Sequence, residues 1–211
     1  TLPVRQLRNG VFDAFTHCVD QFLYPPSTPM FDRFWMSIMK ELVEIGPDVV
    51  QENSSLELHE RLIVACSFAL NMIFTLVKPS YWEIHQFGHQ LTAKYEIDHG
   101  TSLAMVMPAF LESQVQVRQE IYAEAAEYVF GIREGTSEEK AHQFIEKVRE
   151  FIVAIGIPSC VSQWEGAVIE EGDLDKVTDN VMEQTTGGPP FGLNNCCTRE
   201  LVRQVLSKVI V

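Results

Sequence analysis

The sequence is poor in positive charge and has no long apolar run. Its 211 residues carry 16 basic and 29 acidic side chains, a formal net charge of −13 at pH 7. Nucleic acids and anionic membrane surfaces carry the same sign, so we expect neither as a main partner. The most apolar stretch, residues 62–77, is shorter than the about 20 residues of a bilayer span. We therefore expect a buried helix there and no membrane insertion.

Cysteine frameworks and glycine motifs are also missing. The five cysteines form no CxxC pattern and no even set, which is typical of free thiols in a reducing compartment such as the cytoplasm. We expect Cys196 and Cys197 to be part-buried thiols at the start of the last helix. The sequence has no GxGxxG dinucleotide motif, no P-loop and no GxSxG nucleophile motif. No nucleotide-binding signature is therefore present in these residues.

The dominant pattern is a helical period of apolar residues, with no hairpin signal and no clear alternation of a strand. It predicts an all-α, single multi-helix domain over residues 1–211, with one long loop at 185–195. Gly46-Pro47 is expected to end the second helix. The expected helices cover residues 11–22, 29–45, 54–77, 82–95, 98 to about 111, 114–130, 136–155, a short segment from 173, and 198–209.

Two capping boxes support these boundaries. Ser54 with Glu57, and Thr136 with Glu139, each place an acidic residue three positions after a hydroxyl side chain. The helix that begins near residue 54 is apolar nearly all round, so we expect it to be central. Four aromatic residues are expected in the core, namely Phe34, Trp35, Phe68 and Phe74.

Histidine is scarce, with six in the chain, and its placement indicates a metal site. His17 follows Asp13 by four residues, and His85, His89 and His99 share one short stretch. Residues four apart lie on one face of a helix. Three imidazoles and a carboxylate suit a borderline divalent cation such as Zn²⁺ or Fe²⁺. Spacing alone leaves open which two of the three later histidines bind, although the pair His85 and His89 is the simplest choice.

The other polar candidates have ordinary interpretations. His59 and His142 lie among charged neighbours and are expected on solvated helix faces. Asp20 lies seven residues after Asp13 on the same face, where it could orient a ligand imidazole. An ordinary solvated acid is the simpler interpretation of Asp20. Single pairs of the D-x₃-H kind are common by chance, so only the combination of histidines carries weight.

Two segments resemble a known family. LPVRQLRNGVFDAFTHCVDQF (2–22) and IHQFGHQLTAKYEIDHGTSLAMVMPA (84–109) are similar to the iron-containing (group III) alcohol dehydrogenase superfamily. Within it, they resemble the branch of NADPH-dependent butanol dehydrogenases and aldehyde reductases. The resemblance runs along the whole chain and is weaker after about residue 131. It implies the C-terminal helical domain of these enzymes, of the dehydroquinate synthase-like fold.

The resemblance also implies the roles of the histidines. In that family, an Asp and a His from one helix and two later histidines hold a divalent metal. The matching positions are Asp13, His17, His85 and His99. His89 matches a histidine that is not a ligand but lies near the substrate and the nicotinamide, which implies a catalytic and cofactor-binding role. The resemblance thus selects His99 over His89 as the fourth ligand.

Members of the family also carry an N-terminal nucleotide-binding domain with a glycine-rich phosphate loop, and we expect these 211 residues not to include it, because no such loop occurs among them. The resemblance therefore implies the metal-binding half of an NAD(P)-dependent alcohol dehydrogenase or aldehyde reductase, without turnover of its own. Its partners would be a small alcohol or aldehyde, the N-terminal domain, and NAD(P)H, which that domain would mainly bind. The resemblance is also compatible with a homodimer. The metal, Fe²⁺ or Zn²⁺, would polarise the carbonyl or alkoxide oxygen during hydride transfer.

Two other functions remain open from the residues themselves. A helical metal-dependent hydrolase would use the same metal to activate water, although Asp98-His99 reverses the His-Asp order typical of helical phosphohydrolases. A non-enzymatic helical interaction module would carry incidental histidines. Metal content separates the interaction module from both enzymes, and NAD(P)H-linked aldehyde reduction separates the dehydrogenase from the hydrolase.

Overall fold

The computed structural model describes residues 2–24, 28–71, 80, 82–185 and 188–211, and within them the fold is all-α, as predicted. These residues contain one isolated antiparallel bridge, between Phe191 and Cys197, and no longer strand. The helices are α1 (Val4–Phe22), α2 (Pro29–Val49), α3 (Leu56–Ala69), α5 (Glu83–Tyr95), α6 (His99–Phe130), α7 (Ser137–Ala154), α8 (Asp173–Glu183) and α9 (Arg199–Leu206), with short 3₁₀ turns at Val161–Gln163 and Leu193–Asn195.

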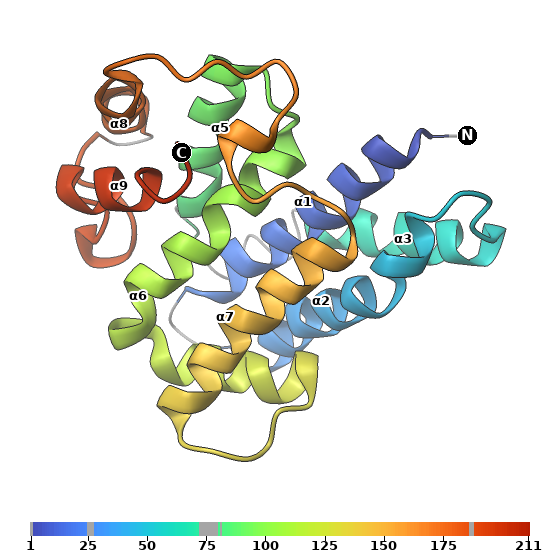
Figure 1. Cartoon of the computed structure of the whole chain (residues 1–211). Helices are drawn as coiled ribbons and strands as arrows, with labels where there is room; N and C mark the ends of the chain where they lie inside the picture. Colours follow the sequence, from blue (N-terminus) through green and yellow to red (C-terminus); the bar gives the residue numbers. More distant parts are fainter. Residues whose placement is uncertain (1, 25–27, 72–79, 81, 186–187) are drawn as a thin grey trace.

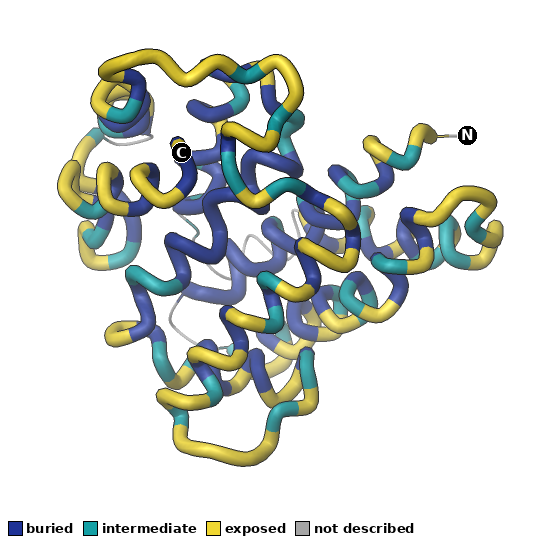
Figure 2. Tube along the Cα trace, viewed as in Figure 1, coloured by how far each residue is buried: buried dark blue, intermediate teal, exposed yellow. Residues whose placement is uncertain are grey.

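The long helix α6 runs through the middle of the molecule (Figure 1). Helix α7 lies along it on one side, and α1 packs against α6, α2 and α3. Helices α8 and α9 pack on each other and contact α5 and α6 respectively. The buried residues form one continuous core, and Figure 2 shows α1 and α6 buried over most of their length. This core fixes α1, α5 and α6 relative to one another.

Helix α1 follows the predicted apolar stripe. Phe12 and Phe15 are fully buried, and both rings pack against Phe151 of α7, with centroids 6.2 and 5.4 Å away. Burying a phenylalanine side chain contributes about 1.5–3 kcal/mol, so this contact is a major part of the core. The polar residues Asp13 and His17 therefore lie on a different side of a rigidly held helix.

The expected end of the second helix at Gly46-Pro47 is wrong, because α2 continues to Val49. Gly46 faces α7, where an added Cβ would lie 2.8 Å from the Phe151 ring. The glycine therefore permits close helix packing. Pro47 lies inside the last turn of α2 and has no N–H to donate, so the Val43 carbonyl lacks its usual helical hydrogen bond.

The prediction for the third helix is partly wrong. Its cap is Ser55, which accepts a hydrogen bond from the Leu58 amide, whereas Ser54 bonds the Val49 carbonyl. Residues 72–77 of the expected helix lie outside the described residues, as does Phe74. Helix α3 is peripheral, and Phe68 is 46% exposed. When apolar residues occur on every side of a helix, the sequence does not show which side packs against the core.

Two aromatic predictions differ in outcome on α2. Trp35 is fully buried, as expected, but Phe34 is 46% exposed and lines a pocket between α2 and α3. None of the described helices combines the length and the hydropathy needed to cross a bilayer.

Later boundaries agree more closely with the sequence. The capping box of Thr136 and Glu139 is present at the start of α7. The two helices expected over 98–130 are one helix, α6, with a kink at Arg118, where φ is −124° and ψ is 16°. The last helix ends at Leu206 and not near Val209. The loop of 185–195 contains a 3₁₀ turn, and its residues 186–187 lie outside the described residues.

Candidate metal site

The four residues singled out as ligands come from three helices. Asp13 and His17 lie one turn apart on α1, His85 lies on α5, and His99 is the first residue of α6. The i,i+4 spacing places Asp13 and His17 on the same face of α1. Packing of α5 and α6 against α1 then brings the later histidines to that face.

Close contact between α1 and the start of α6 positions His99. An added Cβ at Gly100 would lie 2.3 Å from the Asn9 carbonyl oxygen, so only glycine allows this approach. The Asn9 side chain accepts hydrogen bonds from the Thr101 backbone N–H and hydroxyl, both at 3.0 Å, and donates one to Asp98 at 2.8 Å. Asn9 thus holds the first turn of α6 beside α1.

The carboxylate of Asp13 is the centre of the cluster. Its Oδ2 lies 3.4 Å from His17 Nε2, and its Oδ1 lies 3.3 Å from His99 Nε2 and 3.8 Å from His85 Nε2. One ligand atom from each of Asp13, His17 and His85 lies within 4.8 Å of the other two. The His17 and His85 rings stack with centroids 4.5 Å apart.

Several buried polar atoms in this cluster have no hydrogen bond among the described residues. These atoms are Asp13 Oδ1, His17 Nδ1 and His85 Nε2. Buried polar atoms in folded proteins are nearly always hydrogen-bonded, so exceptions call for an explanation. A cation that accepts lone pairs from nitrogen and oxygen would satisfy Asp13 Oδ1 and His85 Nε2. Imidazole and carboxylate donors fit a borderline divalent metal such as Fe²⁺ or Zn²⁺.

Asp20 orients one of the imidazoles. It is buried, and its Oδ2 lies 2.7 Å from His85 Nδ1, while its Oδ1 accepts a hydrogen bond from the Ile84 amide. With Nδ1–H donating to Asp20, His85 turns its Nε2 toward Asp13. The simpler interpretation of Asp20 as a solvated acid is therefore wrong. Helix α5 buries it, which the sequence of α1 alone does not reveal.

The electrostatics of the cluster favour charge on the acid. Burial by itself would raise the pKa of Asp13, but contacts with His17, His85 and His99 outweigh it and hold that pKa well below its usual range. Burial also lowers the pKa of His85, but Asp13 and Asp20 outweigh it and raise that pKa to about 9. The pair of carboxylates thus creates a strong preference for positive charge at this position.

His89 has a different environment. It lies one turn after His85 on α5, is exposed, and stacks on His99 with centroids 5.2 Å apart. Among the described side chains, Asp13 makes no contact with it comparable to those with the other three histidines. A pocket of about 280 Å³ is lined by His89 together with His17, Leu70, Trp82, His85, Gln86 and His99. Burial, with the nearby His99 and His85, lowers the pKa of His89.

Comparison with known proteins shows the family of this chain. The model of the Fe-containing alcohol dehydrogenase family, C-terminal, matches residues 8–209. The chain belongs to the iron-containing alcohol dehydrogenase family. The resemblance seen in the sequence, and the helical fold that it implied, are thereby confirmed.

Individual relatives show the same relationship. The chain is 34% identical over 208 residues to the NADPH-dependent aldehyde reductase YqhD of Escherichia coli. This alignment covers 97% of the chain and 52% of the reductase. It is 28% identical to NADH-dependent butanol dehydrogenase B of Clostridium acetobutylicum, covering 89% of this chain and 48% of that one. The chain thus spans about half the length of the curated relatives it matches.

Solved structures extend the comparison. The substrate- and cofactor-free form of E. coli YqhD superposes with a TM-score of 0.88 at 30% identity, over 98% of this chain and 53% of the reductase. An NADH-dependent butanol dehydrogenase A from Thermotoga maritima superposes with a TM-score of 0.87 at 26% identity, over 100% and 54%. The helical domain seen here is therefore that of the family.

Some residues around the site carried little or no signal in the sequence. Asn9 and Trp82 were not singled out, although the Trp82 ring packs nearly perpendicular to the His17 and His85 rings. Both act through contacts between helices, which a period along one helix does not show. His142 is exposed, as expected, whereas His59 is partly buried and lies within hydrogen-bonding distance of Ser54.

Proposed function

We propose that this chain is the metal- and substrate-binding part of an NAD(P)-dependent alcohol dehydrogenase or aldehyde reductase. Asp13, His17, His85 and His99 would hold a divalent metal. The observation that carries the proposal is the convergence of these side chains with buried atoms that lack hydrogen bonds. Family membership favours this function over a helical hydrolase or a non-enzymatic module.

When bound, a divalent metal supplies Lewis-acid polarisation of the substrate oxygen in the reaction of an alcohol or aldehyde. The protein's part is to hold the ligands. Asp20 keeps His85 in one tautomer and orientation, and Asn9 keeps His99 beside Asp13. The contacts of Asp13 support His99 over His89 as the fourth ligand. The donor set suits both Fe²⁺ and Zn²⁺. The bound metal would therefore depend on the affinity of the site for each ion and on which ion is available in the cell.

His89 would act on the substrate and the cofactor. Its imidazole borders the pocket beside His85 and His99, and its lowered pKa keeps it neutral at pH 7. A neutral imidazole can accept a proton or a hydrogen bond from a substrate hydroxyl. NAD(P)H would be bound mainly by an N-terminal domain, with the nicotinamide reaching the pocket next to His89. This division accords with the relatives, about twice as long as this chain.

The test compares His85→Ala with His89→Ala. Each variant is made in two proteins, namely this chain alone and this chain joined to a nucleotide-binding domain. His85→Ala removes a ligand and should abolish both stoichiometric metal and aldehyde reduction. His89→Ala should keep the metal and lose rate or shift the pH profile, because the missing group contacts the substrate. Metal is measured by elemental analysis, and reduction by NAD(P)H oxidation.

Three outcomes would contradict the proposal. Equal metal loss in both variants would refute the separate roles of His85 and His89. Full activity in both would refute the site. Stoichiometric metal without any NAD(P)H-linked reduction by the joined protein would favour the hydrolase.

A further inference from the structure

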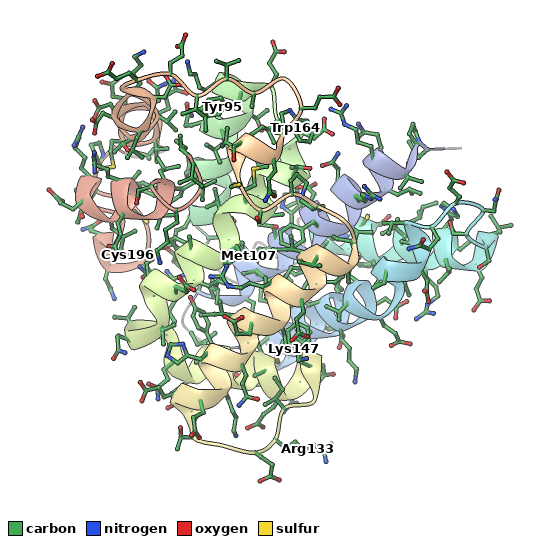
Figure 3. All side chains as sticks on the ribbon, in the orientation of Figure 1. Tyr95, Met107, Arg133, Lys147, Trp164 and Cys196 are labelled. Atoms are coloured by element: carbon green, nitrogen blue, oxygen red, sulfur yellow. The ribbon has the colours of Figure 1, made fainter. Side chains whose placement is uncertain are left out.

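A second cluster of metal-binding atoms lies at the first residue of α5. Glu83 is 1% exposed, and its Oε1 lies 3.4 Å from Cys196 Sγ. The two thiols of Cys196 and Cys197 are 3.7 Å apart. Cys196, labelled in Figure 3, belongs to the segment that precedes α9 and is partly exposed, whereas Cys197 is buried. None of these residues takes part in the Asp13 cluster.

Gly192 allows these three atoms to pack closely against the backbone before α9. A Cβ added at Gly192 would lie 2.5 Å from Glu83 Oε1 and 3.1 Å from each of the two sulfur atoms. Gly192 also has a φ of +82°, a conformation that side-chain-bearing residues rarely adopt. The backbone turn before α9 thus brings one oxygen and two sulfurs close together beside Gly192.

The spacing of these atoms matches that of a tetrahedral metal. A zinc–sulfur bond of about 2.3 Å puts two sulfurs about 3.8 Å apart at a tetrahedral angle, and an oxygen ligand about 3.5 Å from a sulfur. The observed separations are 3.7 and 3.4 Å. One ligand atom from each of Glu83, Cys196 and Cys197 lies within 4.8 Å of the other two. Little movement would be needed to close them on an ion.

The charges around the cluster also suit a divalent ion. Arg118 Nη2 lies 2.7 Å from both oxygens of Glu83, and both side chains are almost completely buried. Two thiolates and one carboxylate carry three negative charges, which a divalent cation and the Arg118 guanidinium balance. Buried charge is costly unless it is compensated, and the occupied cluster would leave no uncompensated charge, just as the Glu83–Arg118 pair leaves none without an ion.

We propose that Glu83, Cys196 and Cys197 form a second cation site, which binds a thiophilic divalent ion of the Zn²⁺ type. Two S–H bonds break, the two protons pass to solvent, and two metal–sulfur bonds form, with no change in oxidation state. The partly exposed Cys196 provides the access, and one coordination position is left for water. The site does not depend on the function proposed for the Asp13 cluster.

Protons and the ion compete for this site. The hydrogen bond with Cys196, together with burial, raises the pKa of the Cys197 thiol. The charged groups that face the thiols are Glu83 from α5 and Arg118 from α6. Because each metal–sulfur bond replaces an S–H bond, binding should release two protons per ion.

The experiment titrates the reduced, metal-stripped 211-residue chain with Cd²⁺. Thiolate–Cd²⁺ bonds absorb in the ultraviolet, whereas imidazole and carboxylate ligands do not, so the two clusters are distinguished in one measurement. We expect the absorbance to saturate at one ion per chain, with two protons released in weak buffer. It should persist in a His17→Ala/His85→Ala variant, which lacks the first site.

Matched cysteine variants test the assignment. Cys196→Ser and Cys197→Ser should each weaken Cd²⁺ binding by more than the roughly 10–100-fold typical of a lost outer-shell contact. Cys66→Ser is the control, because burial raises the pKa of Cys66 to about 11 and it lies away from the cluster. In the unmodified chain, Zn²⁺ should protect Cys196 from alkylation.

The unmodified chain can overturn the proposal even if a serine variant fails to fold. Absence of thiolate absorbance at excess Cd²⁺ would show that Cys196 and Cys197 are structural thiols only. Absorbance that survives in a folded Cys196→Ser/Cys197→Ser variant would place the bound ion elsewhere. Circular dichroism establishes that each variant retains its helices.

Discussion

Two clusters that share helix α5 use their polar atoms in opposite ways. Around His85, buried atoms of Asp13, His17 and His85 have no hydrogen bonds among the described residues. At Glu83, both carboxylate oxygens contact Arg118, and Oε1 also accepts the Leu193 amide at 2.8 Å. The first cluster leaves buried polar atoms without partners, whereas the second satisfies its carboxylate within the protein.

The difference indicates what each cluster does for the fold. An unpaired buried atom costs free energy, so the protein retains the His85 cluster at the expense of stability. The Glu83–Arg118 pair links α5 to the kink in α6, and its neutrality makes it tolerable in the core. The first cluster therefore points to function, and the second links two helices whether or not an ion binds.

The largest effect should come from breaking the second cluster. Arg118→Met leaves the Glu83 carboxylate buried without its cation, so the free energy of unfolding should fall by about 3–5 kcal/mol. Chemical denaturation followed by circular dichroism measures it. Because the His85 cluster is separate, metal bound there should be retained while the variant stays folded.

A double variant is the control for this prediction. Glu83→Gln/Arg118→Met removes both charges and should recover much of the lost stability, because no uncompensated charge remains. If Arg118→Met alone unfolds no more readily than the unmodified chain, the pair does not stabilise the link between α5 and α6.

A smaller effect is expected from Asp20→Asn, which should lower metal affinity at the Asp13 cluster and leave the Glu83 cluster unchanged. Asp20→Asn keeps the shape of the side chain but removes the charge that holds His85 Nδ1. Affinity at the Asp13 cluster should fall roughly 10–100-fold, as measured by competition with a chromophoric chelator. Cd²⁺–thiolate absorbance at Cys196 and Cys197 should be unchanged. A loss at both clusters would show that they are not independent.

The smallest effect concerns a buried acid with a structural role only. Asp173 accepts the Glu170 amide, and Lys94 Nζ lies 3.0 Å from its Oδ1. Burial would raise the pKa of Asp173, but the Glu170 amide and Lys94 outweigh it and lower that pKa. This stabilisation is present above about pH 3.9, the pKa in the unfolded chain, and is lost as pH falls through the lower folded pKa.

Asp173→Asn should therefore flatten the dependence of thermal stability on pH below about pH 4. Melting temperatures between neutral and acidic pH measure it, and metal binding at both clusters should be unaffected. If the melting temperature of Asp173→Asn falls with acid as steeply as that of the unmodified chain, carboxylates other than Asp173 cause the loss of stability.

The helical pattern of this sequence was informative because each helix is amphipathic over several turns. Thr136 and Glu139 marked the start of α7 correctly, and the i,i+4 spacing put Asp13 and His17 on one face. Gly46-Pro47 misled the prediction, because whether glycine ends a helix or permits packing depends on the helix opposite it.

By itself, the sequence determined the helical class, the histidine pairs and the resemblance to the family, since all of these reside in short-range order along the chain. Only the tertiary structure decided that Asp20 is buried against His85, that Asn9 holds His99 beside Asp13, and that Cys196 meets Glu83. These contacts join residues on different helices. These contacts exist only at the angles and distances at which α1, α5 and α6 pack. Many apolar side chains of similar volume would fill the same core, so the pattern along one helix does not predict that packing geometry.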